Sequence, residues 1–127
     1  MFYMQNLKIL WLREDLRTED NDAFINIAKN TEKFTVFYAY DELKFKFRSA
    51  QRWWLYKSLQ KLEDKLSNAG ISFKIFNSDP LTAIKVLAKK YTINQLYFNK
   101  HYEPKEKNTE IEIEKYLEKN QIEVKKY

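Results

Sequence analysis

The side chains best equipped for chemistry stand in one loop, which directly follows a short apolar run. The run is Ile9–Leu12, and six of the nine residues from Arg13 to Asn21 are charged. Guanidinium and carboxylate groups form charge-assisted hydrogen bonds with each other and with polar ligands, and they do not lie unpaired in an apolar core. The loop is therefore predicted to lie at an edge of the fold or to line a binding site.

Residues for nucleophilic catalysis, metal binding or phosphate binding are scarce in this chain. The chain has no Cys and one His, which excludes disulfides, thiolate chemistry and a His-rich metal site. Its one glycine is Gly70, whereas a P-loop and the Gly-x-Gly-x-x-Gly dinucleotide motif need several glycines. A nucleotide-like ligand would have to be held by side chains and helix N-termini. Because few nucleophile–base pairs can be assembled, the isolated chain is expected not to be catalytic.

Length and composition indicate one globular domain, 1–127, with 44% hydrophobic residues. No apolar run approaches the roughly 18 residues that a membrane span needs. The absence of Cys fits the reducing cytoplasm, which is the expected location. A net charge of +5 allows contact with nucleic acid, but many Lys residues stand beside Glu on predicted helices. A solvated mixed-charge surface explains them better.

Hydrophobic periodicity predicts that strands and helices alternate along the whole chain. The expected strands are 7–12, 33–40, 71–77, 95–99 and 122–127. The expected helices are 22–29 with a cap at Asn21 or Asp22, 50–69 with a cap at Ser49, 80–91 with a cap at Asp79, and 105–120. Their expected core residues include Ala23, Phe24, Ile27, Ala28, Leu55, Leu59, Leu62, Leu66 and Ala69. Gly70 is placed to end the second helix.

Such alternation predicts an α/β fold: a three-layer, doubly wound, Rossmann-like, five-stranded parallel sheet. We expect the strand order 3-2-1-4-5, in which the first and fourth strands are neighbours. The charged loop would then face the loop that follows the fourth strand, 100–104. Ligands of such sheets bind at the carboxyl ends of the strands, where the strand order reverses.

The segment 11–17, WLREDLR, followed by Asp20-Asn21 and an apolar helix, resembles the opening signature of the DNA photolyase/cryptochrome family. That signature reads Trp-Phe-Arg-basic-Asp-Leu-Arg, then Asp-Asn-Pro-Ala-Leu, and here Leu12, Glu14 and Asp22 replace its Phe, basic residue and Pro. Three more blocks match in the family order: 49–62 in the long helix, 79–80 (Asp-Pro), and 97–104 (Tyr-x-Asn-x-x-Tyr-Glu-Pro). Together the blocks cover nearly all of the chain.

The resemblance implies the N-terminal α/β domain of a photolyase, which often holds a light-harvesting chromophore: a folate such as methenyltetrahydrofolate, a deazaflavin or a flavin such as FMN. In that family a larger helical domain follows, binds FAD and carries the light-driven repair of damaged DNA or the signalling of cryptochromes. Nothing in this chain matches that helical domain. The implied partners are therefore the helical domain, in the same or a separate chain, and damaged DNA through it.

The predicted chromophore-binding residues are Trp11, Arg13, Asp41, Arg52, His101, Glu103, Lys105 and Glu106. By the resemblance, Glu103 and Glu106 match acidic positions that hydrogen-bond a folate or deazaflavin ring. His101 stands where some deazaflavin binders have an acid, and Lys105 stands where folate binders have Asn. Three of these residues have a structural alternative: Asp41 as a turn residue, Arg52 as a surface cation, and Glu103 as a cap on the following helix.

Four loop residues are expected to be structural: Asp15, Arg17, Asp20 and Asn21. The expectation is an ion-pair network that positions the loop, while Arg13 lines the ligand site or joins the same network.

A second cluster, Trp53, Trp54 and Tyr56, surrounds a core-facing Leu55 in the long helix. At least part of it is expected to meet a neighbouring domain or to be exposed, where it could drive self-association.

The sequence allows two other functions. One is a stand-alone nucleotide- or flavin-binding module, which would bind ATP, AMP or a flavin without a second domain. A cryptochrome-type photoreceptor domain is a variant of the main interpretation. The other is direct DNA or RNA binding through the basic surface. It ranks last because the chain lacks an aromatic-basic repeat and a recognisable nucleic-acid motif.

Overall fold

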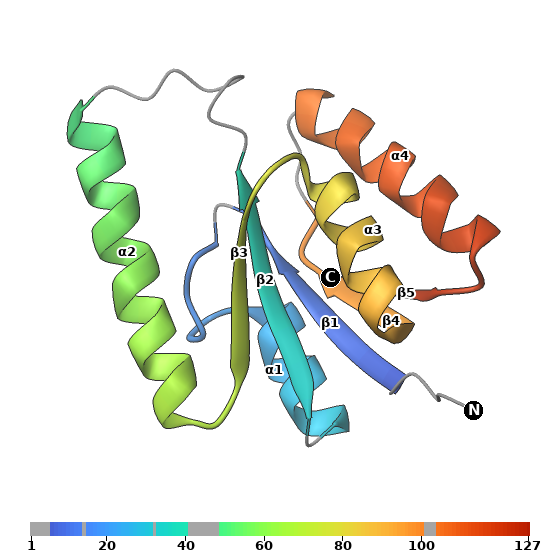
Figure 1. Cartoon of the computed structure of the whole chain (residues 1–127), viewed down its shortest axis with the longest axis horizontal. Helices are drawn as coiled ribbons and strands as arrows, with labels where there is room; N and C mark the ends of the chain where they lie inside the picture. The colour runs from blue at the N-terminus through green and yellow to red at the C-terminus, as the bar shows by residue number, and fades with distance from the viewer. Residues whose placement is uncertain (1–5, 14, 32, 41–48, 101–103) are drawn as a thin grey trace.

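The computed structural model describes residues 6–13, 15–31, 33–40, 49–100 and 104–127. A five-stranded parallel sheet is flanked by two helices on each face (Figure 1). The strands are β1 (Asn6–Leu12), β2 (Phe34–Tyr40), β3 (Ser72–Asn77), β4 (Thr92–Phe98) and β5 (Glu123–Lys126). The helices are α1 (Asp22–Asn30), α2 (Ser49–Asn68), α3 (Pro80–Lys90) and α4 (Pro104–Lys119).

The strand order is β3-β2-β1-β4-β5, which confirms the predicted doubly wound sheet. The strand β1 is central, since Leu10 is paired in register with Val36 on one side and with Tyr97 on the other. The switch in strand order therefore lies between β1 and β4, as expected. This places the loop after β1 and the segment after β4 at the same edge of the sheet.

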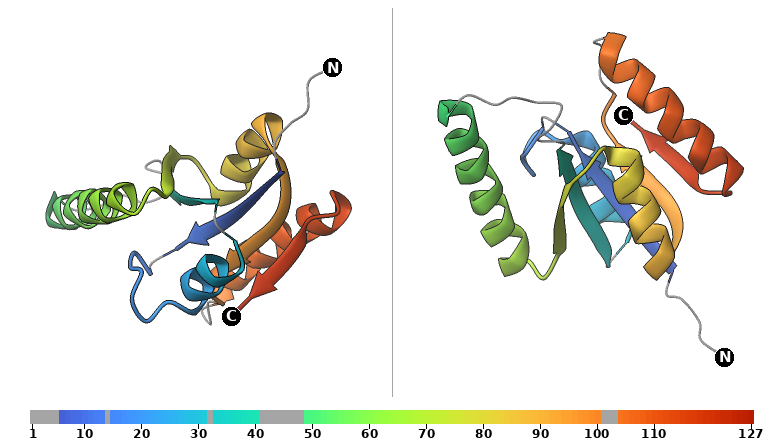
Figure 2. Two further views of the ribbon diagram at one scale, coloured as in Figure 1. Left: turned by 90° about the horizontal axis from the view of Figure 1, so that it is seen from below. Right: turned by 45° about the horizontal axis from the view of Figure 1, so that its top comes forward.

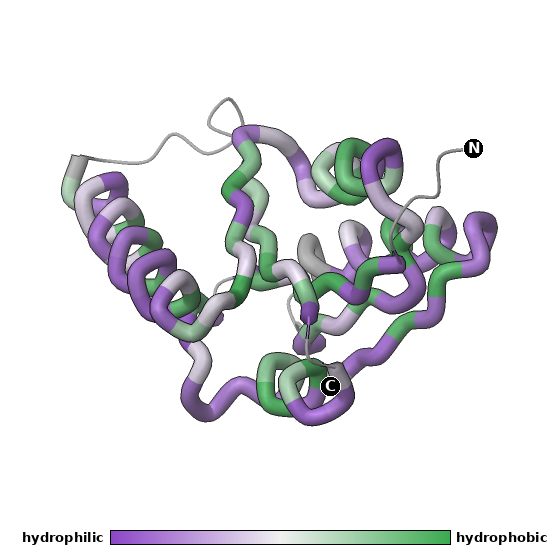
Figure 3. Tube along the Cα trace, turned by 60° about the horizontal axis from the view of Figure 1, so that its bottom comes forward, coloured by the Kyte–Doolittle hydropathy of each residue, from purple (hydrophilic) through white to green (hydrophobic). Residues whose placement is uncertain are grey.

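Alternate residues of β1 support two cores, one on each face of the sheet. Ile9 and Trp11 pack with α3 and α4, whereas Leu10 and Leu12 pack with α1 and α2. All four side chains are buried, because a central parallel strand is covered on both faces, and this explains the unbroken apolar run in the sequence. Figure 2 shows the helices on the two sides of the sheet, and Figure 3 shows the apolar strands running between them.

The helix starts follow the capping residues in the sequence. The Oδ1 atom of Asn21 accepts a hydrogen bond from the Phe24 backbone N–H at 3.0 Å, so Asn21 caps α1. The Oδ2 atom of Asp79 accepts from the Thr82 N–H at 3.1 Å, and Pro80 occupies the first turn of α3. Ser49 differs from the prediction, because it is the first residue of α2 instead of preceding it.

One strand boundary and two expected core residues differ from the predictions. The strand β4 begins at Thr92, three residues before the predicted start, because α3 ends at Lys90 and the buried Ile93 already pairs with Leu7. Ala28 and Ala69, which were expected to face the core, are exposed. Both lie at the end of a helix, where the chain leaves the sheet surface.

The helix α2 ends at a left-handed glycine. Gly70 has a φ of +74°, and the Ile71 N–H donates to the Leu66 carbonyl at 2.8 Å, closing the last turn. Nothing lies within 4 Å of a Cβ added to Gly70. We therefore expect Gly70→Ala to lower the free energy of unfolding by only about 1–2 kcal/mol, through backbone strain alone. Gly70→Asn should cost less, because Asn tolerates this conformation, and chemical denaturation of the two variants measures the difference.

No helix among the described residues is long and apolar enough to cross a membrane.

Candidate functional site

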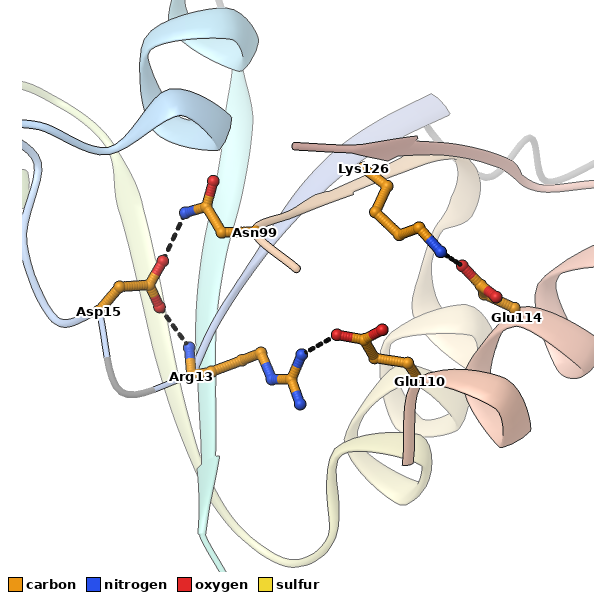
Figure 4. Close-up of polar contacts among 6 residues, drawn as sticks. All are labelled: Arg13, Asp15, Asn99, Glu110, Glu114 and Lys126. Carbon is orange, nitrogen blue, oxygen red and sulfur yellow. Dashed lines mark hydrogen bonds and ion pairs between the residues drawn. The ribbon is translucent and has the colours of Figure 1, made fainter. Parts of the chain in front are cut away.

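The loop after β1 is fixed to the segment after β4 by the carboxylate of Asp15. Its Oδ1 atom accepts a hydrogen bond from the Arg13 backbone N–H at 2.8 Å. Its Oδ2 atom accepts from the side-chain amide of Asn99 at 2.5 Å (Figure 4). Asn99 follows β4 directly, so this contact joins the two strands on either side of the switch point. Hydrogen bonds to a charged acceptor are among the stronger ones in proteins.

Asn99 also holds the start of α1. Its Nδ2 atom donates to Asn21 Oδ1 at 2.7 Å, and its Oδ1 atom accepts from the Ala23 N–H at 3.1 Å. The Nδ2 atom of Asn21 donates to the Arg17 carbonyl at 2.9 Å, so the buried Asn21 ties the end of the loop to its middle. Amides thus connect the loop, α1 and β4 around the carboxylate of Asp15. We refer to Asp15, Asn21 and Asn99 as the amide lock.

The amide lock differs from the expected ion-pair network in its chemistry. Asp15 and Asn21 hold the loop through hydrogen bonds. The guanidinium of Arg17 is exposed, and its Nη2 atom donates to the Asp20 carbonyl at 3.4 Å. Asp20 adopts a φ of +50°, a left-handed turn conformation that Asp tolerates. Asn99 belongs to the sequence block 97–104 but was not among the predicted site residues. Its position at the carboxyl end of the predicted strand 95–99, at the switch point, is the signal that could have identified it.

Arg13 lies inside the protein and pairs with α4. It is 7% exposed, its Nη1 atom forms an ion pair with Glu110 Oε1, and Glu110 is 6% exposed (Figure 4). The guanidinium carbon lies 4.6 Å from the ring centroid of Trp11, which itself packs on Phe98 at 5.2 Å. The structure therefore places Trp11 and Arg13 in the core on the α4 side, where they anchor that helix to the end of β1.

The other predicted ligand residues are not gathered by the described part of the chain. Arg52 lies in the first turn of α2 with an exposed side chain. Lys105 and Glu106 lie in the first turn of α4, where the description covers the backbone only. Asp41, His101 and Glu103 lie outside the described residues. Their contacts with a ligand stay predictions.

Two aromatic side chains outside the predicted set of site residues lie at the carboxyl end of β2. Tyr38 and Tyr40 stack with 6.0 Å between ring centroids and 21° between ring planes, and both are half-buried. They share the face of β2 that carries Phe34 and Val36 and meets α1 and α2. Stacked aromatic rings provide a flat apolar surface that suits another planar ring. The signal was the alternation of aromatics at this end of the strand.

Among the described residues, the shifted pKa values belong to residues of β5 and to Tyr127, which follows it. Hydrogen bonds from Lys125 and Gln95 lower the pKa of Glu123, and the bond to Glu123 raises the pKa of Lys125. Desolvation raises the pKa of Tyr127, whose ring stacks on Tyr97. Because Glu123 is exposed, its shift reflects a surface pair on an edge strand. In the described residues, no group of three or more His, Cys, Asp or Glu could hold a metal ion.

Comparison with known proteins identifies the family of this chain. The profile of the DNA photolyase family matches residues 8–127. The deoxyribodipyrimidine photo-lyase of Agrobacterium fabrum is 27% identical over 76% of this chain, and cryptochrome-2 of Arabidopsis thaliana is 31% identical over 80% of it. This chain spans 20% and 17% of those two relatives.

Solved structures agree in fold over the whole chain. A class III photolyase from Agrobacterium tumefaciens superposes with a TM-score of 0.83 at 22% identity, covering 100% of this chain and 26% of that one. A cryptochrome from Synechocystis sp. PCC6803 gives 0.82 at 24% identity, covering 100% and 28%. The protein therefore belongs to the DNA photolyase family, and its fold is that of the family's N-terminal α/β domain.

Proposed function

We propose that this chain is one domain, 1–127, of a photolyase-type protein and binds a planar light-harvesting chromophore at the carboxyl edge of its sheet. The observation that carries the proposal is the amide lock, which fixes the edge between β1 and β4. A binding site works best when its supporting side chains are held in place before the ligand arrives. Light harvesting needs a held chromophore and no catalytic side chain, which fits the chain's chemical inventory.

The stacked Tyr38 and Tyr40 support a planar ligand in particular. Both rings are half-buried at the same edge of the sheet, on the strand that pairs with β1, and the loop after β1 is the one that the amide lock holds. We assign Arg52, Lys105, His101, Glu103 and Glu106 as candidate polar contacts that select the ligand. The candidate chromophores are a folate, a deazaflavin, FMN or a second FAD.

One relative supports including FAD among the candidate chromophores. The photolyase of Sulfolobus tokodaii, whose structure matches with a TM-score of 0.76 at 24% identity, is described with two FAD molecules and the implication of a novel light-harvesting cofactor. That chromophore belongs to the Sulfolobus protein. For this chain it motivates testing FAD beside the folate, deazaflavin and FMN.

The activity of the larger assembly is also part of the proposal. We infer that this domain docks on a helical FAD-binding domain and passes excitation energy to it. That domain would act on damaged DNA in a photolyase or signal in a cryptochrome, and the relatives include proteins of both names. The cytoplasm is the proposed location.

Absorbance and fluorescence titrations of the purified chain test the chromophore proposal. We expect a near-UV or blue band to be retained after incubation with a folate, a deazaflavin, FMN or FAD, and the emission of the buried Trp11 to fall as the ligand binds. Tyr38→Leu/Tyr40→Leu should weaken binding about tenfold, since each aromatic stack contributes about 0.5–1.5 kcal/mol. Arg52→Ala and Glu103→Ala should weaken it as well.

The matched control is Tyr116→Leu, which changes a half-buried tyrosine that packs on the opposite face of the sheet. It should bind like the unaltered chain. Failure of all four chromophores to bind would contradict the proposal. Binding of AMP or ATP in their place would favour the alternative function, a nucleotide-binding module.

A further inference from the structure

The backbone of Tyr127 pairs with the segment that carries Asn99. The Tyr127 N–H donates a hydrogen bond to the Phe98 carbonyl at 3.0 Å, and the Lys100 N–H donates to the Tyr127 carbonyl at 2.7 Å. This pattern continues the parallel pairing of β4 with β5 and sets Tyr127 opposite Asn99. The two hydrogen bonds therefore hold the backbone on both sides of the residue that completes the amide lock.

The ring of Tyr127 provides a second attachment. It stacks on the ring of Tyr97, with 6.3 Å between ring centroids and 15° between ring planes. Tyr97 is 1% exposed, belongs to the core on the α1 side of the sheet, and donates its hydroxyl proton to Gln95 Oε1 at 3.1 Å. The Nε2 atom of Gln95 in turn donates to Glu123 Oε2 of β5 at 2.8 Å. The stack and these hydrogen bonds tie β5 and Tyr127 to β4.

The side chain of Asn99 depends on the placement of its backbone, because it contacts three other parts of the chain. It donates to Asp15 and Asn21, and it accepts from the Ala23 N–H. The Ala23 N–H lies in the first turn of α1, where backbone donors have no partner within the helix. A shift of the Asn99 backbone would disturb all three hydrogen bonds together, and hydrogen bonds weaken steeply outside a narrow range of distance and angle.

The strand β5 is an edge strand, which pairs with β4 at the end of the sheet (Figure 1). Its opposite face is attached through Val124, which packs on the core at α3 and α4, and through the ion pair of Lys126 with Glu114 at 2.8 Å (Figure 4). Of these attachments, Tyr127 is the one that lies opposite Asn99. Local opening of β5 would therefore reach the amide lock through Tyr127.

We propose that Tyr127 is a positioning residue of the carboxyl edge: it holds Asn99 in place, so that the edge strand β5 controls the amide lock and the affinity of the chromophore site. The effect on chromophore affinity rests on the proposed function, whereas the effect on Asn99 does not. Loosening β5 at the outer edge of the sheet would thereby weaken a site that is built on β1, β2 and β4.

Site-resolved hydrogen exchange of three variants tests the positioning. Tyr127→Phe keeps the ring stack and the backbone bonds, and it should exchange like the unaltered chain. Tyr127→Ala removes the ring, and Tyr127→Pro also removes the N–H that donates to Phe98. We expect exchange at the Ala23 amide to quicken several-fold in Tyr127→Ala and about tenfold more in Tyr127→Pro, through the lost hydrogen bond. Exchange at the Val36 amide of β2, which reports overall stability, should quicken less.

Two comparisons separate positioning from a general loss of stability. Lys126→Met removes a surface ion pair from the same strand and should leave exchange at Ala23 unchanged. In a chain that already carries Asn99→Ala, Tyr127→Pro should no longer quicken exchange at Ala23 relative to Val36, because the side chain through which it acts is gone. Equal quickening at Ala23 and Val36 overturns the proposal. So does an effect of Tyr127→Pro that persists in the Asn99→Ala chain.

Chromophore binding provides a second measurement. A folate, a deazaflavin, FMN and FAD are each titrated into the unaltered chain, Tyr127→Phe and Tyr127→Pro. Each chromophore that binds the unaltered chain should bind Tyr127→Phe normally and Tyr127→Pro several-fold more weakly. Equal affinity of Tyr127→Pro overturns the control of the site by β5. If none of the four binds the unaltered chain, the proposed function fails alone, because exchange at Ala23 is measured without a ligand and still decides the positioning of Asn99.

Discussion

Replacing Arg13 with Met is expected to lower the free energy of unfolding by about 3–5 kcal/mol, because removing one partner of a buried ion pair strands the other charge. Here the stranded charge is the carboxylate of Glu110, which is as buried as Arg13 and belongs to α4. The variant also loses the cation that lies over the ring of Trp11. Urea denaturation followed by circular dichroism measures the loss.

Two control variants test whether the stability lost in Arg13→Met comes from the buried ion pair. Lys126→Met removes the cation of an exposed pair with Glu114, at 2.8 Å, and should cost at most about 1 kcal/mol. Arg13→Met/Glu110→Leu removes both buried charges together and should recover most of the stability, since apolar replacements of a buried pair are often neutral. Equal losses for Arg13→Met and Lys126→Met would show that the pair of Arg13 and Glu110 is not buried as described.

Replacing Asn99 with Leu is expected to lower the free energy of unfolding by about 2–4 kcal/mol, because the side chain makes three hydrogen bonds and one of them is to a carboxylate. Leu has a similar size, so the loss comes from polar groups left without a partner. The loop after β1 and the start of α1 should loosen locally. Hydrogen exchange should therefore quicken at the Arg13 and Ala23 amides, and chemical denaturation measures the global loss.

The control for this variant is Asn26→Leu. Asn26 makes one exposed hydrogen bond within α1, to the Asp22 carbonyl at 2.8 Å, and its replacement should change stability by less than about 0.5 kcal/mol. A double-mutant cycle with Asp15→Ala and Asn99→Ala should return a coupling free energy of about 0.5–3 kcal/mol. Unchanged exchange at Arg13 and Ala23 in the Asn99 variant would contradict the role of the amide lock.

The fold could be predicted because its signals are local. The apolar run 9–12 predicts a central strand, since residues on both of its faces are buried, and Asp79 followed by Pro80 marks a helix start through two independent preferences. The start of β4 was missed because 92–94 is a polar stretch with a single apolar residue, Ile93. Its strand character arises from pairing with β1, which the sequence does not display.

The site was harder to predict from the sequence than the fold, because its contacts join distant segments of the chain. Glu110 stands in a helix that contains several other Glu residues, and its burial follows from Arg13, which is 97 positions away. Asp15 and Asn21 were predicted to hold the loop, but the amide of Asn99 could be assigned to them only after β1 and β4 were placed side by side. The pattern of alternating aromatics does not reveal the stacking of Tyr38 on Tyr40, because stacking depends on side-chain rotamers.

The central place of β1 has a consequence for how the fold is completed during synthesis. The strand β1 can pair with β2 as soon as both have been synthesised, but its other edge waits for β4, since Leu10 is in register with Tyr97. Until β4 has emerged, that edge exposes unpaired backbone groups and half of an apolar core to any other nascent chain. Non-local pairing of this kind slows folding, because a long loop must close before its contacts form.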